Sequence, residues 1–164
     1  MKERPRIKIE LTVVDKIIEL ISWVLLIGIW ILTITNYQNL PETIPIHFDS
    51  KGVADGFGNK SMLFHLPIVG TVIFIGLTIL NKFPHTFNYL QEITIENAFK
   101  QYRIATRMMR VLKLIIVLIF GLISYQVIKH AAGEIEGLSS WFLPFVLISI
   151  FVPTIYFMIK SSQP

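Results

Sequence analysis

Residues 17–35 form an apolar run, IIELISWVLLIGIWILTIT, in which Glu19 is the one charged residue. The hydrocarbon core of a bilayer is about 30 Å thick and an α-helix rises about 1.5 Å per residue, so about 20 apolar residues span it. The run is longer than the apolar region of a usual signal peptide, and no cleavage site of the A-x-A kind follows it. We therefore interpret it as a retained transmembrane helix.

Three further apolar runs of similar length follow, at 62–80, 111–128 and 141–159. Hydrophobic residues make up 53% of the chain and charged residues 16%, whereas soluble chains have about 45–50% and about 25%. The sequence predicts an all-α membrane protein: a single domain, 1–164, with four transmembrane helices. The connections between them are 36–61, 81–110 and a short third one.

Lysine and arginine are unequally divided between the two sides of such a bundle. The two tails and the connection before the third span share a side and carry twelve of these residues, whereas the other side carries three. Cytoplasmic flanks are enriched in positive charge, so we predict that both ends are cytoplasmic and that 36–61 faces out. This position also explains the formal net charge of +4, and it favours a membrane surface over nucleic acid as the partner.

The connection 81–110 has a helical pattern in its second half. Apolar residues there recur at spacings of three and four, and a basic stripe with the same spacing lies on another face. This pattern predicts an amphipathic helix that contacts anionic headgroups and precedes the third span. We expect Lys113 to extend its ammonium to the headgroups, and Glu19 to be solvated or paired with Lys16. The stripe consists of Lys100, Arg103, Arg107 and Arg110.

The outer connection 36–61 is rich in proline and glycine but is not a slack linker. Pro41 and Pro45 fix their own φ and bias the preceding residues toward extended conformations. Residues 49–52, DSKG, are typical of a turn in which Gly52 takes a positive φ. A compact loop of this kind is suited to recognition.

The same loop carries a motif that resembles the integral-membrane family known as domain of unknown function 1648. The family pattern is L-P-x-x-I-P-x-H-F-x-x-x-G-x-x-D, followed by a lysine and by a proline in the next helix. The resemblance covers roughly 17–80, and a similar domain begins the SdpI-type bacterial immunity proteins. It implies a multi-pass protein of the bacterial plasma membrane with an immunity or signalling role. The matching residues are Leu40, Pro41, Ile44, Pro45, His47, Phe48, Gly52, Asp55, Lys60 and Pro67.

Three polar residues of the loop, His47, Asp49 and Asp55, are of the types that ligate zinc, although their spacing matches no firm zinc signature. The structural interpretation is that His47 and Asp55 bind loop backbone and that Asp55 pairs with Lys60. The chain has no cysteine and none of the common hydrolase, nucleotide-binding or metalloprotease motifs. We therefore assign no catalytic residue, metal or cofactor.

Three functions remain open on these grounds. The favoured one is a non-enzymatic protein that binds or senses a ligand, peptide or membrane partner through the outer loop. An oligomeric transporter or pore is the alternative, because the central turns of the spans carry no ionisable residue that would serve a monomeric one. A metal-dependent enzyme using His47, Asp49 and Asp55 is the third. An oligomer would place helix contacts at Gly28, Gly70, Gly76 and Gly121.

Overall fold

The computed structural model describes residues 4–163, so residues 1–3 and 164 of the expected domain lie outside it. The structure is mostly helical, and it confirms four helices that are long and apolar enough to cross a membrane. The elements follow in the order α1 (Val13–Tyr37), β1 (Thr43–Phe48), β2 (Ala54–Asn59), η1 (Lys60–Phe64), α2 (His65–Leu80), η2 (Pro84–Thr86), α3 (Ala98–Ala131) and α4 (Phe142–Ser162).

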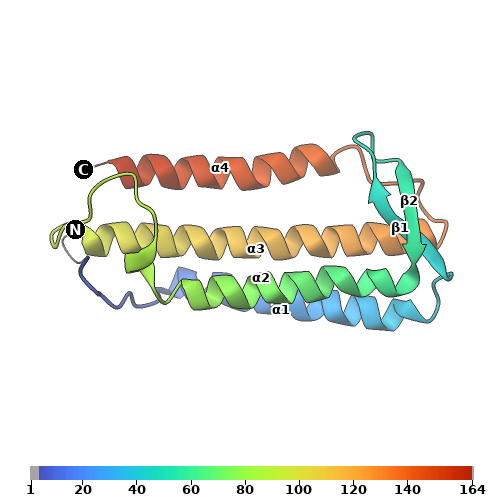
Figure 1. Ribbon diagram of the computed structural model, residues 1–164, viewed down its shortest axis with the longest axis horizontal. Helices are drawn as coiled ribbons and strands as arrows, with labels where there is room; N and C mark the ends of the chain where they lie inside the picture. The colour runs from blue at the N-terminus through green and yellow to red at the C-terminus, as the bar shows by residue number, and fades with distance from the viewer. Residues whose placement is uncertain (1–3, 164) are drawn as a thin grey trace.

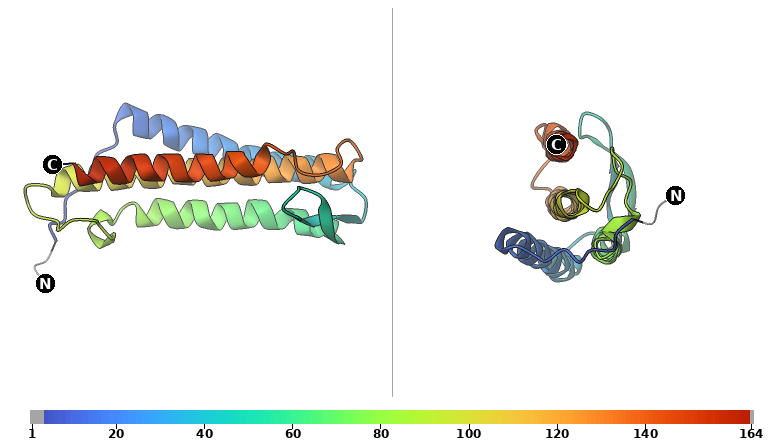
Figure 2. Two further views of the ribbon diagram at one scale, coloured as in Figure 1. Left: turned by 90° about the horizontal axis from the view of Figure 1, so that it is seen from above. Right: turned by 90° about the vertical axis from the view of Figure 1, so that its left-hand side faces the viewer.

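Helix α3 is the centre of the bundle, and each of the other three helices packs against it (Figures 1 and 2). The start of α1 and the end of α4 lie at one end of the bundle, and the strands lie at the other. Helices α1 and α3 run in the same direction, since Asp15 pairs with Arg107 and Glu19 with Lys113. The chain therefore crosses the bundle alternately, as four consecutive spans require.

The core between the helices is small, and much of the apolar surface faces outward. Leu26 and Ile29 of α1, Phe74 of α2 and Val117 of α3 form one buried cluster. Large apolar side chains on the outer faces of α1, α2 and α4 are exposed. In water such a surface would be unfavourable, and in a bilayer it is the surface that lipid covers.

The outer connection contains an antiparallel β-hairpin, which differs from the all-α fold that the sequence predicts. Strand β1 pairs with β2 from Thr43 opposite Asn59 to Phe48 opposite Ala54. The β-branched residues Thr43, Ile44 and Ile46 and the aromatic Phe48 in β1 favour the extended conformation. The hairpin gives the backbone amides and carbonyls of the loop partners within the loop itself, which a position next to the bilayer requires.

The amphipathic helix expected before the third span, which could either bend or run into it, runs directly into it. Residues 98–110 are the first part of α3, a continuous helix of 34 residues. No glycine or proline interrupts that stretch before Gly121, so nothing in the sequence ends the helix at the start of the span. Residues 81–97 instead form an irregular cap against which the amino-terminal tail packs through Ile7 and Ile9.

Candidate functional site

Most motif residues of the outer loop hold the hairpin onto the bundle. Leu40 and Ile44 are buried with Leu63 against the end of α3, where they contact Val127 and Ile128. Pro45 and Pro67 are buried as well. These side chains are apolar because burial against the packed ends of α2 and α3 removes them from water, which is favourable for apolar surface.

Two further motif residues attach the hairpin through their rings and charges. The Phe48 ring lies 6.0 Å from the His130 ring of α3. The Lys60 ammonium lies 2.9 Å from Glu42 and 5.2 Å from the centre of the Tyr37 ring. Lys60 therefore pairs with Glu42, and the expected pair between Asp55 and Lys60 is not the one that forms.

The remaining polar motif residues, His47 and Asp55, face each other across the hairpin. His47 Nδ1 lies 2.5 Å from Asp55 Oδ1, and the two side chains are 71% and 47% exposed. The expectation that they bind loop backbone is wrong for this contact, because the strand register places them together. The pair presents one acid–base couple on the exposed surface of the hairpin.

The exposure of this pair sets its expected contribution to stability. Ion pairs in water contribute about 0–1 kcal/mol, because high dielectric and side-chain entropy offset the attraction. We expect Asp55→Asn to change the free energy of unfolding by less than about 1 kcal/mol, as measured by chemical unfolding in detergent. A loss of several kcal/mol would instead make His47–Asp55 a structural clamp.

The turn between the strands is held by Asp49 and Gly52. Asp49 Oδ1 accepts hydrogen bonds from the backbone amides of Lys51 and Val53, both at 2.8 Å. Gly52 has a φ of +83°, as the DSKG pattern predicts. Asp49 is therefore occupied within the turn, and in residues 4–163 no three histidine, aspartate or glutamate side chains converge as metal ligands.

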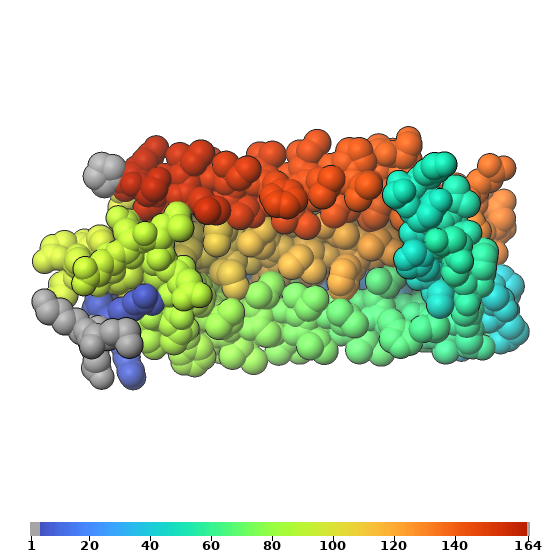
Figure 3. Space-filling model, turned by 45° about the horizontal axis from the view of Figure 1, so that its top comes forward, coloured from blue at the N-terminus to red at the C-terminus, as the bar shows by residue number. Residues whose placement is uncertain are grey.

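The tip of the hairpin docks onto the connection between α3 and α4. Gly52 O accepts a hydrogen bond of 2.8 Å from Leu138 N, and Val53 forms an antiparallel bridge with Gly137. The close approach requires glycine on both sides, since a Cβ at Gly52 would lie 2.5 Å from Leu138 O. In Figure 3 the hairpin lies across one end of the bundle, between the ends of α2 and α4.

This docking leaves a half-open cavity of about 360 Å³ at the hairpin end. The polar residues that line it are Asp49, Lys51 and three serines. Its apolar lining comes from both docked segments. The lining residues are Phe48, Asp49, Ser50, Lys51, Gly52, Leu138, Ser139, Ser140, Phe142 and Leu143.

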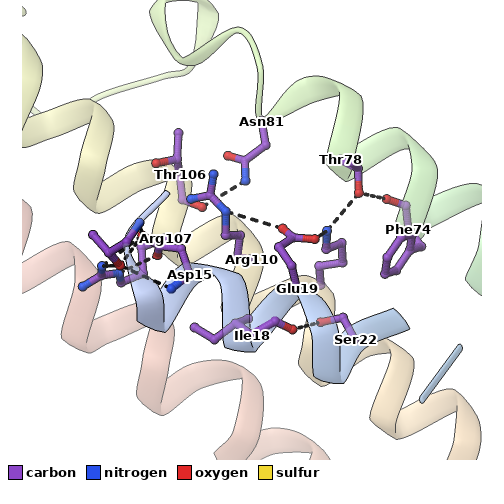
Figure 4. A network of polar contacts seen from close by, with 12 residues as sticks. Asp15, Ile18, Glu19, Ser22, Phe74, Thr78, Asn81, Thr106, Arg107 and Arg110 are labelled. Carbon is purple, nitrogen blue, oxygen red and sulfur yellow. Dashed lines mark hydrogen bonds and ion pairs between the residues drawn. The ribbon is translucent and has the colours of Figure 1, made fainter. Parts of the chain in front are cut away.

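A second polar cluster lies at the opposite end of the bundle, between α1 and α3 (Figure 4). Arg107 donates to both carboxylate oxygens of Asp15, with Nε–Oδ1 at 2.8 Å and Nη2–Oδ2 at 3.1 Å. Arg107 also donates to Thr12 Oγ1 at 2.8 Å. Thr12 caps α1, so the two-pronged Arg107 guanidinium joins the first turn of α1 to the first part of α3.

One turn further along α1, the Glu19 carboxylate contacts two cationic side chains. Its Oε2 lies 2.6 Å from Lys113 Nζ, and its Oε1 lies 3.4 Å from Arg110 Nε. Lys113 also donates to Thr78 Oγ1 of α2 at 2.9 Å. The Lys113 side chain is only 1% exposed, so it does not extend to the headgroups as expected.

These contacts correct the interpretation of the basic stripe. Arg107 and Arg110 point into the bundle and pair with α1, because the carboxylates there stabilise them better than the apolar surroundings would. Arg103 is exposed, and Lys100 donates to the backbone carbonyl of Gln163 at 2.9 Å. Glu19 pairs with α3 rather than with Lys16, and ionisable groups do lie between the spans.

A signal for this cluster is present in the sequence. The buried or paired residues of α1 alternate at spacings of four and three, which is a heptad pattern. Matching positions in α3 lie 92 and 94 residues further on in the pairs Asp15–Arg107 and Glu19–Lys113. The α1 positions are Asp15, Glu19, Ser22, Leu26, Ile29 and Thr33.

Two of the four glycines named for contacts in an oligomer face neighbouring helices of the same chain. A Cβ at Gly70 would meet Phe120, and one at Gly121 would meet Ile29. Gly28 and Gly76 have no described side chain or other backbone within 4 Å of the Cβ position. Within residues 4–163, close packing therefore explains Gly70 and Gly121 only.

The comparisons with known proteins point to the hairpin segment. A protein of Archaeoglobus fulgidus described as uncharacterized is 28% identical over 151 residues, and the alignment covers 82% of each chain. No solved structure matches. Residues 24–71 match the family model of the domain of unknown function DUF1648. This segment runs from the middle of α1 through the hairpin into α2 and contains the whole motif, so the resemblance of the hairpin to that family is confirmed.

Proposed function

We propose that this chain is a non-enzymatic, multi-pass protein of a bacterial plasma membrane that recognises an amphipathic ligand at its hairpin end. Both chain ends face the cytoplasm in this proposal, and the hairpin faces out. The observation that carries it is the cavity between the hairpin tip and the α3–α4 connection. A recognition role of this kind agrees with the immunity or signalling role that the resemblance to SdpI-type proteins implies.

The lining of the cavity indicates the chemical class of the ligand. Lys51 is exposed and lines the cavity, and its side chain has no ion pair or hydrogen bond with residues 4–163. Phe142 and Leu143 begin the apolar face of α4 directly beside it. A peptide with a free carboxyl group and an apolar segment would pair with Lys51 and lay that segment along α4.

Two exposed polar residues lie on the strands of the same hairpin. His47 and Asp55 pair with each other and present an imidazole and a carboxylate to the surroundings. Neither is needed to close the hairpin, since backbone pairing and the buried residues do that. In this proposal the pair opens to bind polar groups of the ligand.

The proposal predicts where a ligand is captured. With a photoreactive phenylalanine derivative in place of Ser140, irradiated cells should yield a peptide adduct identifiable by mass spectrometry. Lys51→Gln should reduce the yield by about tenfold, which corresponds to the loss of one ion pair of about 1.4 kcal/mol.

Lys129→Gln is the matched control, because Lys129 is on the same side of the bundle but pairs with Glu134 at 2.6 Å. It should leave the yield unchanged. Adducts with lipid alone, or equal yields from both variants, would reject recognition of a peptide at the cavity.

A further inference from the structure

The charges of the cluster between α1 and α3 do not balance. Three cations, Arg107, Arg110 and Lys113, face two carboxylates, Asp15 and Glu19. Both carboxylate oxygens of Asp15 accept hydrogen bonds from Arg107, and Glu19 makes its short contact with Lys113. One positive charge remains without an equal partner among the described residues.

That charge lies on Arg110. Its side chain is 8% exposed, and its Nε makes no hydrogen bond within residues 4–163. The contact with Glu19 Oε1, at 3.4 Å, is long for a charge-assisted hydrogen bond. A buried guanidinium whose Nε lacks a hydrogen-bond acceptor is unfavourable in a low-dielectric region, so an acceptor from outside the chain would stabilise it.

A second unsatisfied atom lies next to it. Asn81, at the end of α2, donates from Nδ2 to Thr106 O, one turn before Arg110, at 3.1 Å. Its Oδ1 is buried and has no partner in the described part of the chain. Figure 4 shows Arg110 between Glu19 and the Asn81–Thr106 contact. The place therefore offers both a strong donor and a free acceptor.

The depth of Arg110 identifies the kind of group that reaches it. Arg110 precedes Ala131, the last residue of α3, by 21 residues, which is about 31 Å of helix. The hydrocarbon core is about 30 Å thick. With the hairpin end at one boundary of the core, Arg110 lies at the other boundary, at the level of the phosphates.

We infer that Arg110 and Asn81 form a binding site for a phosphate group whose substituent carries a hydroxyl donor. The guanidinium fork matches two phosphate oxygens, and the hydroxyl would donate to Asn81 Oδ1. The end of α2 supplies only a partial negative charge, about half an elementary charge, so it does not replace the anion. A glycerol phosphate headgroup of the adjacent leaflet has this chemistry, and so does glycerol phosphate in solution.

The test uses the full chain in nanodiscs of phosphatidylcholine, with or without phosphatidylglycerol. Native mass spectrometry counts retained phosphatidylglycerol, and thermal unfolding measures its effect on the protein. The wild-type chain should retain the lipid and unfold at a higher temperature with it. Arg110→Gln should lower retention by about tenfold and remove the shift.

Lys16→Gln is the matched control, because Lys16 is exposed in the first turn of α1, next to Asp15, and lies outside the basic stripe. It should retain the lipid and the shift. Equal losses in both variants, or no loss in Arg110→Gln, would overturn the site. If Arg110→Gln does not fold, Arg110→Lys keeps the charge without the fork and should weaken retention; unchanged retention would again overturn it.

Glycerol 3-phosphate, added to discs of phosphatidylcholine alone, distinguishes a soluble phosphate from a lipid headgroup as the ligand. Stabilisation by the soluble compound that depends on Arg110 would support the site and assign its ligand to the cytoplasm. Retention of phosphatidylglycerol without that response would support the lipid as the ligand. A chain that responds to neither would overturn the inference.

Discussion

Replacing Glu19 with glutamine is expected to lower the free energy of unfolding by about 3–5 kcal/mol, the usual cost of removing one partner from a buried ion pair. Glu19 is the shared acceptor of Lys113 and Arg110. The amide keeps the size of the side chain but removes the charge, so two cations would remain among apolar helices. Unfolding in detergent, followed by circular dichroism, measures the loss.

Two further variants show that the loss comes from this pair. Glu10→Gln changes an exposed carboxylate in the tail before α1 and should have little effect. The double change Glu19→Leu with Lys113→Leu removes both charges and should recover much of the stability, because an apolar pair can replace a buried ion pair. A Glu19→Gln chain as stable as Glu10→Gln would mean that the cluster does not hold α1 to α3.

Gly52→Ala is expected to release the hairpin tip from the α3–α4 connection. The new Cβ would strain a φ of +83° and lie 2.5 Å from Leu138 O. The strained φ alone costs about 1–3 kcal/mol, and the clash with a backbone atom adds to it. We expect destabilisation of at least about 3 kcal/mol and opening of the cavity beside Lys51.

The Gly133→Ala variant distinguishes the effect of backbone strain from the effect of a steric clash. Gly133 has a φ of +76° but no described side chain or other backbone within 4 Å of its Cβ position, so this variant carries the strain without the contact. Because the chain has no cysteine, Leu138→Cys provides a single labelling site at the docking point. A maleimide should label it faster in the Gly52→Ala chain than in the Gly133→Ala chain. Equal rates would show that the tip is not held by this contact.

The four spans could be predicted because their signal is local and additive. Each is a run of apolar residues of the length that a bilayer demands, and no partner elsewhere in the chain is needed to recognise it. The turn at Gly52 is local as well, since DSKG carries its own geometry. The family motif was recognisable for the same reason, as its residues lie close together in the sequence.

The hairpin and the charge cluster could not be predicted in the same way. The strands of the hairpin are short, and proline and glycine within them favour a loop over a strand. Arg107 and Arg110 have the spacing of a solvated face, and only the carboxylates of α1, more than ninety residues away, turn that face inward. A helical pattern shows which residues share a face but not what the face meets.

By itself, the sequence determined that the chain is a helical membrane protein with four spans and a structured loop, because length, hydropathy and turn chemistry act over a few residues. The tertiary structure decided which motif residues are structural, such as Ile44 and Lys60, and which are presented outward, such as His47. It also decided that Lys113 is buried and that a cavity forms beside Lys51. These outcomes depend on contacts between distant segments, whose energies only the packed bundle defines.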